Sequence, residues 1–468
     1  MNIEDVFLKQ KEFYNKHIID DVNYRLKKLK LLKGVIKENE NKIYEALKLD
    51  LGKSNVESYM TEVGMVLEDL SYVIKHFKKW CKDDKVSTPL AQFPSKSYIK
   101  KIGYGRVLII SPWNYPFLLS IQPLVGAIAA GNTVILKPSE YSINTTKVIK
   151  EILSKVFKNE YVYTAIGDKE IAEQLLKLKF DYIFYTGSTK VGKIVMENAA
   201  KNLVPVTLEL GGKSPCIIDN KSNVKLAAKR IVFGKLLNAG QTCVAPDYVL
   251  VDKDVKKEFI SYLIKYIKEF LGDNTLENTE YPKIISNNHF ERLINLIEKT
   301  KANKNSKLLF GGNYDKDTLK IEPTIIEINN KVLRDDSKLD ILNEEIFGPI
   351  LPIIETNNIE EAAQYINKKE RPLALYLFTN NKKNEEYILN NIKFGGGCIN
   401  DTVIHLANSK LPFGGIGNSG LGNYHGKFSF DTFTHNVSIV KKSTLIDLPM
   451  RYHPYTKFNE KIIKMFMK

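Results

Sequence analysis

The chain has 468 residues, too many for a single hydrophobic core, so we expect two or three domains. With 43% hydrophobic and 26% charged residues, the composition is ordinary for a soluble globular protein. The formal net charge of +15 comes mainly from lysines dispersed along the chain. Because no basic stripe lies on a recognisable module, we expect a solvated lysine surface and no nucleic-acid binding.

The cysteine content and the N-terminus together indicate a reducing compartment, and we expect a cytoplasmic protein. The four cysteines are far apart and form no CxxC pair, which argues against a disulfide framework or a zinc ribbon. They are Cys81, Cys216, Cys243 and Cys398. The N-terminal segment "MNIEDVFLKQ" has no apolar core of a signal peptide. No HExxH motif or His/Cys cluster is present, so we predict no metal.

The first 80 residues are predicted to be helical, because apolar residues from Leu29 to Leu47 recur at roughly helical spacing. From about residue 100, short β-type runs alternate with helix-compatible segments. These runs are 106–111, 132–140, 181–188, 205–210 and 215–219. The alternation predicts an α/β fold with a parallel sheet covered on both faces. Such sheets bind ligands at the carboxyl ends of their strands.

Residues 117–136 are apolar over a membrane-spanning length, but Gln, Pro, Gly and Asn interrupt them. We expect a buried helix followed by a buried strand there. A second α/β region is expected from about 212 to 400, with "LGGKSP" (210–215) as a hinge before it. Glycines then cluster in 394–400 and 411–426, where interleaved aromatics favour tight loops near a site, and 436–442 is expected to be a late strand.

Two motifs lie where a parallel sheet presents ligands. "YTGSTKVGK" (185–193) follows a strand and opens a helix, whose N-terminus suits a phosphate, although its GxTxxG spacing departs from GxGxxG. An ordinary glycine-containing turn remains the alternative. "LKPSE" (136–140) places Lys137 and Glu140 at a strand end. Both side chains can hydrogen-bond a ribose diol; the alternative is a solvated ion pair.

Three residues have side chains suited to acyl chemistry. Asn114 in "SPWNYP" is a potential oxyanion donor or a turn asparagine. Glu209 in "LELGGKSP" is a potential general base or a solvated strand-end carboxylate. Cys243 in "NAGQTCVAPD" is a nucleophile only if an electropositive or hydrogen-bonded setting favours its thiolate. Otherwise it is a small buried hydrophobe, as we expect for Cys81 and Cys216.

Taken in order, the motifs WN, KPSE, TGSxxVG, ELGGKSP, GQTC, EEIFGP and LPFGGxGNSG resemble the aldehyde dehydrogenase superfamily from about residue 20 to residue 440. The segments "GQTCVAPDY", "GNSGLGNYHGKFSFDTFTH" and "RYHPY" resemble class 3, which includes the fatty aldehyde enzymes. The resemblance implies a Rossmann-like NAD(P)-binding domain (1–81 and 101–210) and an α/β catalytic domain (211–410). It also implies a small β oligomerisation extension with the C-terminal tail (82–100 and 425–468).

The resemblance also implies a role for each matched residue. Cys243 would attack the aldehyde, Asn114 with the Cys243 N–H would hold the oxyanion, and Glu209 would activate the water that hydrolyses the thioester. Lys137 and Glu140 would hold the adenosine ribose. The other expected cofactor-binding residues are Trp113, Gly187, Ser188, Thr189, Lys190, Val191, Gly192, Glu345 and Phe347. Candidates for the substrate pocket are Tyr115, Thr242 and His405.

Several alternatives stay open at this point. A CoA-acylating aldehyde dehydrogenase would not need a water-activating base, so Glu209 favours hydrolysis. A catalytically silent binding relative would be expected to lose Cys243, Asn114 or Glu209, and the chain keeps all three. The cofactor is NAD or NADP, although Glu140 should repel a 2′-phosphate.

The expected partners are a small-molecule aldehyde and a second copy in a homodimer. The apolar residues among the lysines of the tail 457–468 are too few to span a bilayer. Their pattern is compatible with peripheral binding to an anionic membrane surface. The chain length and type of the aldehyde do not follow from the sequence.

Overall fold

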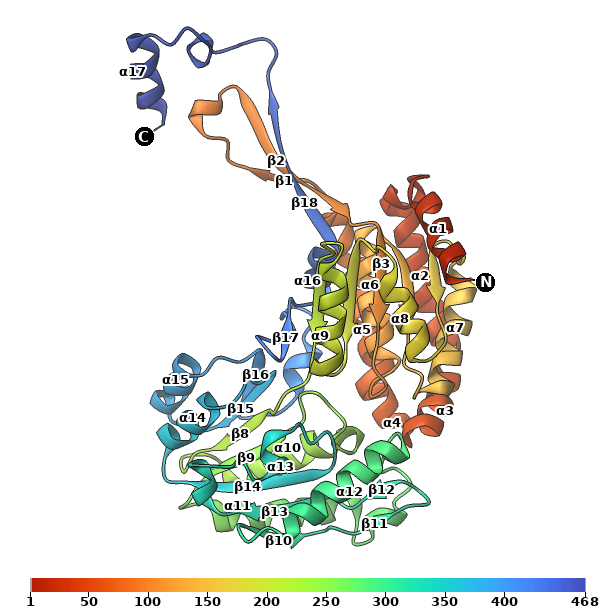
Figure 1. The fold of residues 1–468 in the computed structure, drawn as a ribbon, viewed down its shortest axis with the longest axis vertical. Coiled ribbons are helices and arrows are strands. Elements are labelled where there is room, and N and C mark those ends of the chain that lie inside the picture. Colours follow the sequence, from red (N-terminus) through yellow and green to blue (C-terminus); the bar gives the residue numbers. More distant parts are fainter. Residues whose placement is uncertain (1, 468) are drawn as a thin grey trace.

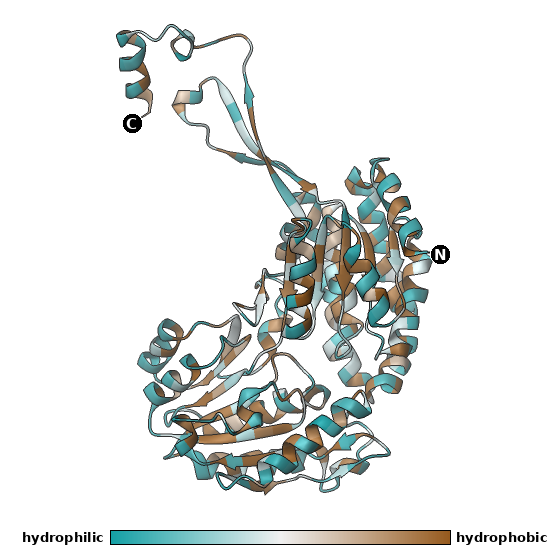
Figure 2. Ribbon diagram, in the orientation of Figure 1, coloured by the Kyte–Doolittle hydropathy of each residue, from teal (hydrophilic) through white to brown (hydrophobic). Residues whose placement is uncertain are grey.

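The computed structural model describes residues 2–467 and contains two large sheets, each flanked by helices, and a narrow arm that projects from one end (Figure 1). The sequence prediction of an α/β fold with mainly parallel sheets is confirmed. Apolar residues concentrate in the strands and on the inward faces of the helices (Figure 2). The central strands β3 and β4 are apolar along almost their whole length because helices cover both faces of their sheet.

The N-terminal segment forms a helical layer, as its periodicity predicts. Its longer helices are α1 (Ile3–Tyr14), α2 (Val22–Glu38), α3 (Glu40–Leu51) and α5 (Gly64–Trp80). Between α3 and α5 lie the short helix α4 (Asn55–Ser58) and a π-helical turn, η2 (Tyr59–Val63). This irregular stretch ends directly at α5, so the chain changes helical geometry without leaving the layer.

The first sheet has six strands in the order β17-β7-β6-β3-β4-β5. They are β3 (Arg106–Ile110), β4 (Thr133–Lys137), β5 (Val162–Thr164), β6 (Tyr182–Thr186), β7 (Val206–Glu209) and β17 (Gly420–Leu421). All neighbours are parallel except β17, which returns from late in the chain to pair antiparallel with β7. The flanking helices are α6 (Leu118–Ala130), α7 (Ile143–Val156), α8 (Lys169–Lys177), α9 (Thr189–Ala200) and α16 (Gly426–Thr432).

Helix α6 and strand β4 account for the long apolar run at 117–136, so the prediction of a buried helix followed by a buried strand is confirmed. All of α6 but Leu119 is buried. Among residues 2–467 no helix is both long and apolar enough to cross a membrane.

The second sheet has seven strands in the order β10-β13-β14-β9-β8-β15-β16, and all are parallel except the edge pair β10–β13. The strands are β8 (Pro215–Ile218), β9 (Tyr248–Asp252), β10 (Ser306–Phe310), β13 (Thr324–Ile328), β14 (Ile350–Thr356), β15 (Ala374–Phe378) and β16 (Gly396–Ile399). Its helices are α10 (Val224–Leu236), α11 (Lys256–Leu271), α12 (Asn287–Lys301), α13 (Asp340–Asn343), α14 (Ile359–Asn367) and α15 (Lys382–Asn391). A small hairpin joins β11 (Tyr314–Asp315) to β12 (Lys320–Ile321).

The arm is a three-stranded antiparallel sheet of β1 (Asp84–Val86), β2 (Ser95–Gly103) and β18 (Thr434–Lys442). Strand β18 begins two residues before the predicted strand at 436 and pairs with β2 along its full length. Beyond it the chain ends in the amphipathic helix α17 (Lys457–Phe466), which lies at the tip of the arm (Figure 1). The sequence analysis did not predict this helix.

Candidate active site

Cys243 lies in a turn between helix α10 and strand β9. The turn begins with three residues in the left-handed region, Asn238, Ala239 and Gly240, with φ angles of 52°, 50° and 76°. Consecutive left-handed residues are uncommon outside glycine and mark a conformation that the surrounding structure must hold. At Gly240 a side chain would also collide, because a Cβ there would lie 2.3 Å from the carbonyl oxygen of Gly348. The backbone before Cys243 is therefore tightly constrained.

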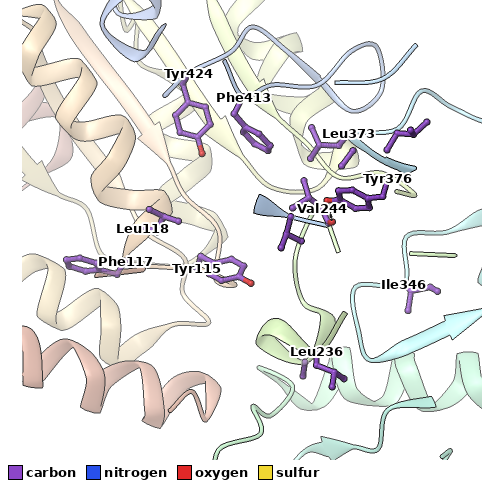
Figure 3. Packing of buried hydrophobic residues seen from close by; sticks show 14 of the residues in the cluster. Tyr115, Phe117, Leu118, Leu236, Val244, Ile346, Leu373, Tyr376, Phe413 and Tyr424 are labelled. Atoms are coloured by element: carbon purple, nitrogen blue, oxygen red, sulfur yellow. Dashed lines mark hydrogen bonds between the residues drawn. The ribbon is translucent and has the colours of Figure 1, made fainter. Parts of the chain in front are cut away.

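Asn114 and Tyr115 follow β3 in the first sheet and contact the Cys243 turn from the opposite side. The side-chain amide of Asn114 donates to the carbonyl oxygen of Gln241 at 3.0 Å. The hydroxyls of Tyr115 and Thr242 hydrogen-bond at 2.6 Å. The structure thus brings Asn114 and Tyr115 into contact with Gln241 and Thr242, and each of the two bonded pairs is separated by 127 positions in the sequence. Figure 3 shows Tyr115 and Val244 approaching from these two parts of the chain.

The environment of the Cys243 thiol differs from the electropositive setting that the sequence analysis considered. Burial, followed by the charges of Glu345 and Glu209, raises the pKa of Cys243 to about 12. The backbone N–H groups of Cys243 and Val244 act in the opposite direction, by hydrogen bonding to the sulfur. The hydrogen-bonded setting is present, but burial outweighs it, so the resting group is a thiol.

Glu209 ends strand β7 and is 2% exposed, so the alternative of a solvated strand-end carboxylate is wrong. Within residues 2–467 neither carboxylate oxygen has a hydrogen-bond partner. Burial therefore raises the pKa of Glu209 well above its ordinary value. A carboxylate with a raised pKa is a stronger base than an exposed one, and its two oxygens are available to a water molecule.

Four predicted positions meet at one edge of the first sheet, because β3, β4, β6 and β7 are parallel and their carboxyl ends coincide. Asn114 follows β3, Lys137 ends β4, Gly187 follows β6 and Glu209 ends β7. The N–H of Gly187 donates to the carbonyl oxygen of Glu209 at 2.9 Å, which joins two of these ends directly. The chemistry-bearing residues are thus gathered by the topology rather than by proximity in sequence.

Helix α9 begins at this same edge. Ser188 caps it, since the Val191 N–H donates to the Ser188 hydroxyl at 3.4 Å, and the Thr189 hydroxyl donates to the carbonyl oxygen of Asn418 at 3.1 Å. Lys190 and Val191 are exposed in the first turn. Gly192 lets the helix approach the sheet, because a Cβ there would lie 2.5 Å from Leu210 Cδ2.

At the end of β4, Lys137 Nζ lies 2.6 Å from Glu140 Oε2. The lysine side chain is buried and the carboxylate is partly exposed, so the alternative of a fully solvated ion pair is wrong for Lys137. The pair presents a cation and a carboxylate to the same edge of the sheet as the N-terminus of α9. That arrangement can bind a diol next to a phosphate.

The segment "EEIFGP" reaches the site from the second sheet. Phe347 has a φ of 51°, and its ring packs edge-on against Trp113 with centroids 5.3 Å apart. Trp113 also contacts the ring of His289 at 4.9 Å. Glu345 is half-buried, and desolvation of its carboxyl, followed by the charge of Asp247, raises its pKa to about 8. Its Oε1 has no hydrogen-bond partner within the described residues.

An ion pair that the sequence analysis did not single out holds this segment in place. Lys213 pairs with Asp247, and its Nζ also donates to the carbonyl oxygens of Ile341 and Glu344, each at 2.8 Å. Asp247 in turn accepts the N–H of Ile346 at 3.0 Å. Both residues belong to motifs already quoted, "LGGKSP" and "NAGQTCVAPD". No local pattern, however, indicates that their side chains meet.

His405 lies at the edge of the site. Its ring centroid is 6.1 Å from that of Tyr376, whose hydroxyl donates to the carbonyl oxygen of Val244 at 2.6 Å. Burial lowers the pKa of His405 to about 4, and its Nδ1 lies 3.5 Å from Cys398 Sγ. His405 therefore acts as a neutral, mainly apolar ring beside Tyr376 (labelled in Figure 3).

The residues at the sheet edge suit a nicotinamide dinucleotide. The capped N-terminus of α9 offers free N–H groups to a phosphate, and the Lys137–Glu140 pair suits a ribose diol. Glu345, with its unpartnered Oε1, and Phe347 come from the second-sheet side, Phe347 packs against Trp113 of the first-sheet side, and Glu345 lies close enough to Cys243 to influence the pKa of the thiol. The cofactor would thus span the two sheets, with its reactive end near the thiol.

Comparison with known proteins gives the family of the chain. The model of the aldehyde dehydrogenase family matches residues 20–439. The chain is 48% identical, over 100% of its length and 99% of the relative, to 4,4′-diaponeurosporen-aldehyde dehydrogenase from Staphylococcus aureus (strain NCTC 8325 / PS 47). It is 43% identical to the dimeric, NADP-preferring aldehyde dehydrogenase of Rattus norvegicus, over 95% of each chain. Other relatives are named as family 3 aldehyde dehydrogenases.

A solved structure of the substrate-bound state of Staphylococcus aureus AldH superposes with a TM-score of 0.95, at 48% identity and with 100% of both chains covered. The chain belongs to the aldehyde dehydrogenase family. It is an NAD(P)-dependent enzyme that oxidises aldehydes to carboxylic acids, as the resemblance of its motifs predicts.

Proposed function

We propose that Cys243, Asn114 and Glu209 are the catalytic residues of this aldehyde oxidation. The observation that carries the proposal is the hydrogen bond from the Asn114 amide to Gln241, two residues before Cys243, which supports a role for this amide as oxyanion donor. An amide nitrogen carries two hydrogens. One is used by Gln241, and the second is available to a substrate oxygen.

In the first half-reaction Cys243 releases its proton to solvent, which is the proton of the overall equation, and its sulfur bonds to the aldehyde carbon. The carbonyl π electrons move to the oxygen, and this oxyanion accepts hydrogen bonds from Asn114 Nδ2 and from the N–H of Cys243. A bound nicotinamide would supply the acceptor for the hydride that leaves this carbon, so that overall aldehyde, water and oxidised cofactor would give acid, reduced cofactor and a proton. Cys243 is left as a thioester.

In the second half-reaction Glu209 takes a proton from a water molecule, whose oxygen attacks the thioester carbon. The carbon–sulfur bond breaks, the carboxylic acid leaves, and the proton taken up by Glu209 is passed to the sulfur, which restores the Cys243 thiol. Burial of Glu209 supports this role, because its raised pKa makes its carboxylate a strong base. The same burial excludes bulk water, so the base acts on a single positioned molecule.

The test separates the two half-reactions. Glu209→Gln should still release one equivalent of reduced cofactor in a rapid burst, and steady turnover should fall by at least about 10²-fold, the lower range for loss of a general base. Cys243→Ala should lose both the burst and the turnover. Full steady turnover in either variant would overturn the assignment of that residue.

The cofactor-binding roles follow the geometry of the sheet edge. Lys137 and Glu140 bind the adenosine ribose, the first turn of α9 from Gly187 to Gly192 lies along the phosphates, and Glu345 binds the nicotinamide ribose. Trp113 and Phe347 pack beside the ring. Tyr115, Thr242 and His405 remain candidates for the substrate side of the site.

We infer that the substrate is an apolar aldehyde. The 48% identity to a dehydrogenase named for 4,4′-diaponeurosporen aldehyde, over the whole chain, supports this. Production of NADH and NADPH should be measured with short aliphatic, long aliphatic, polyene and aromatic aldehydes. A higher kcat/KM for short hydrophilic aldehydes than for long apolar ones would contradict the inference.

The proposed assembly is a homodimer formed through the arm. The edge of β18 and the apolar residues Leu445, Phe458 and Met465 are exposed in the single chain, and a sheet edge of this kind invites pairing. The relative from Rattus norvegicus is named as dimeric.

We propose that the domains divide along the three sheets at the boundaries predicted from sequence and that the enzyme is cytoplasmic. Binding of α17 to an anionic membrane is a further hypothesis. Failure of the protein to sediment with anionic liposomes at low salt would contradict it.

A further inference from the structure

A fully buried ion pair lies outside the residues described so far. Lys53 Nζ and Glu62 Oε1 are 2.6 Å apart, and both side chains have no solvent exposure. Lys53 follows α3, and Glu62 belongs to the π-helical turn η2 (Tyr59–Val63) in the N-terminal helical layer. Two charges removed from water carry a large desolvation cost, so stability alone is a weak explanation for such a pair. π-Helical turns are frequent at functional sites.

The contacts of Glu62 lead directly to the Asn114 segment. Glu62 Oε2 accepts the N–H of Phe117 at 2.8 Å and that of Leu118 at 3.2 Å. These N–H groups belong to the start of helix α6, where no carbonyl of the helix itself can receive them. Glu62 thus caps the helix that begins four residues after Asn114.

The contacts of Lys53 reach Asn114 itself. Lys53 Nζ donates to the carbonyl oxygen of Asn114 at 3.3 Å and lies 3.9 Å from the centre of the Tyr115 ring. The same carbonyl oxygen accepts the side-chain amide of Asn238 at 2.7 Å. Two donors from different parts of the chain therefore hold the peptide group of Asn114. With the backbone held, the Asn114 side chain points toward Gln241.

The other side of the site is held from the same short stretch of chain. Glu57 in α4 accepts the N–H of Asn238 at 2.6 Å, where the left-handed turn before Cys243 begins. Residues 53–62 thus contact both the segment that bears the oxyanion donor and the turn that bears the nucleophile. Neither Lys53, Glu57 nor Glu62 belongs to any of the motifs quoted above.

We propose that Lys53 and Glu62 are positioning residues, which set Asn114 against the Cys243 turn so that its amide meets the oxyanion. This role rests on the function proposed above for Asn114. The pair acts mainly through the backbone of residues 114–118, and its hydrogen bonds reach none of the residues proposed above to bind the cofactor. A displacement of about 1 Å at a catalytic group costs up to about 10²-fold in rate.

The test measures the rate constant of the first burst of NADH or NADPH, which reports thioester formation. Glu62→Gln and Lys53→Met should each slow the burst at least about tenfold, within the range for misplaced catalytic groups. The cofactor dissociation constant, measured by fluorescence titration, should change less than about twofold, because no contact to the cofactor edge is lost.

A double-mutant cycle with Asn114→Ala decides whether the pair acts through Asn114. In that background Glu62→Gln should slow the burst by less than about threefold, because the donor that it positions is already absent. A purely structural role would give the same factor in both backgrounds and would overturn the proposal. A wild-type burst in Glu62→Gln alone would also overturn it. If Asn114→Ala itself keeps a wild-type burst, the function proposed for Asn114 fails instead.

Two further variants exclude loss of folding and general damage to β3 as explanations for a slower burst. Removing one partner of a buried pair destabilises a protein, so Lys53→Met/Glu62→Gln, which removes both charges, replaces the single variants if they do not fold. A wild-type burst in this double variant overturns the proposal. The matched control is Asp181→Asn, because Asp181 accepts the N–H of Arg106 at 2.8 Å at the opposite end of β3. The thermal midpoint of Asp181→Asn should fall while its burst rate constant stays unchanged. A burst slowed as much as in Glu62→Gln would show that any damage to β3 slows the burst, and it would overturn the proposal.

Discussion

The side-chain amide of Asn114 and the carbonyl oxygen of Gln241 are 3.0 Å apart, and this hydrogen bond joins the carboxyl edge of the first sheet to the turn that carries Cys243. It predicts that Asn114→Ala lowers kcat by about 10²- to 10³-fold, as expected for loss of one oxyanion donor. Cofactor affinity should stay unchanged. Steady-state kinetics and cofactor titration check both statements.

The control for Asn114 is Tyr115→Phe, which breaks the neighbouring hydrogen bond between Tyr115 and Thr242. It joins the same two segments but offers no amide to the substrate. We expect it to lower kcat by less than about tenfold, in keeping with a net hydrogen-bond contribution of about 1 kcal/mol. Equal losses in the two variants would mean that the contact between the segments, rather than the amide, matters.

Glu140 should select against a 2′-phosphate on the adenosine ribose. Glu140→Gln should raise the ratio of kcat/KM for NADP to that for NAD by about fivefold, since two like charges at 4 Å repel by about 1 kcal/mol in water. Lys137, which pairs with Glu140, remains in place. Glu170→Gln, an exposed change on α8, is the control and should leave the ratio unchanged. An unchanged ratio in Glu140→Gln would show that the 2′-phosphate of NADP does not bind near Glu140.

The Cys243 thiol should alkylate slowly at neutral pH in the absence of cofactor, because its pKa is raised to about 12. The rate of modification by iodoacetamide should increase with pH throughout the accessible range. Glu345 contributes to this only when it is ionised, above its own pKa of about 8. Glu345→Gln should therefore speed alkylation above pH 8 and have little effect below it. Mass spectrometry of Cys243 over time gives both rates, and an effect confined to low pH would contradict the assignment.

The buried carboxyl of Asp69 should make the free energy of unfolding depend on pH. It is buried in α5, and burial raises its pKa from 3.8 to about 7. The folded state therefore keeps a proton that the unfolded chain loses, and the free energy of unfolding falls as the pH rises from about 4 to about 7. The interval corresponds to at most about 4 kcal/mol at 1.36 kcal/mol per pH unit.

In Asp69→Asn this loss is absent, because the amide does not titrate and can still accept the N–H of Gly426, which Asp69 Oδ1 accepts at 3.3 Å. The difference in free energy of unfolding between variant and wild type should thus shift in favour of the variant from pH 4 to pH 7 and stay constant above. Denaturant titrations at several pH values measure it. A difference independent of pH would show that Asp69 stays ionised when folded.

Much of the fold was predictable from local pattern. The strands β3, β4, β6, β7 and β8 appear in the sequence as short runs rich in β-branched and aromatic residues, because central strands of a covered sheet are apolar throughout. The short strand β5 and the helix α17 were missed. β5 has only three residues, and α17 lies in a stretch that was considered as a membrane contact rather than as secondary structure.

The sequence by itself determined the family and the reaction class of this protein through the order of its motifs, and it supplied the cysteine, the amide and the carboxylate that we propose as catalytic groups. Only the tertiary structure decided how these groups are held. Lys53 and Glu62 lie outside the family motifs, and Lys213 and Asp247 lie in two separate motifs, so in neither pair does a local pattern indicate that the side chains meet. Burial, and with it the raised pKa of Cys243 and Glu209, likewise depends on packing between two sheets. Such properties arise when distant segments meet, so local pattern cannot contain them.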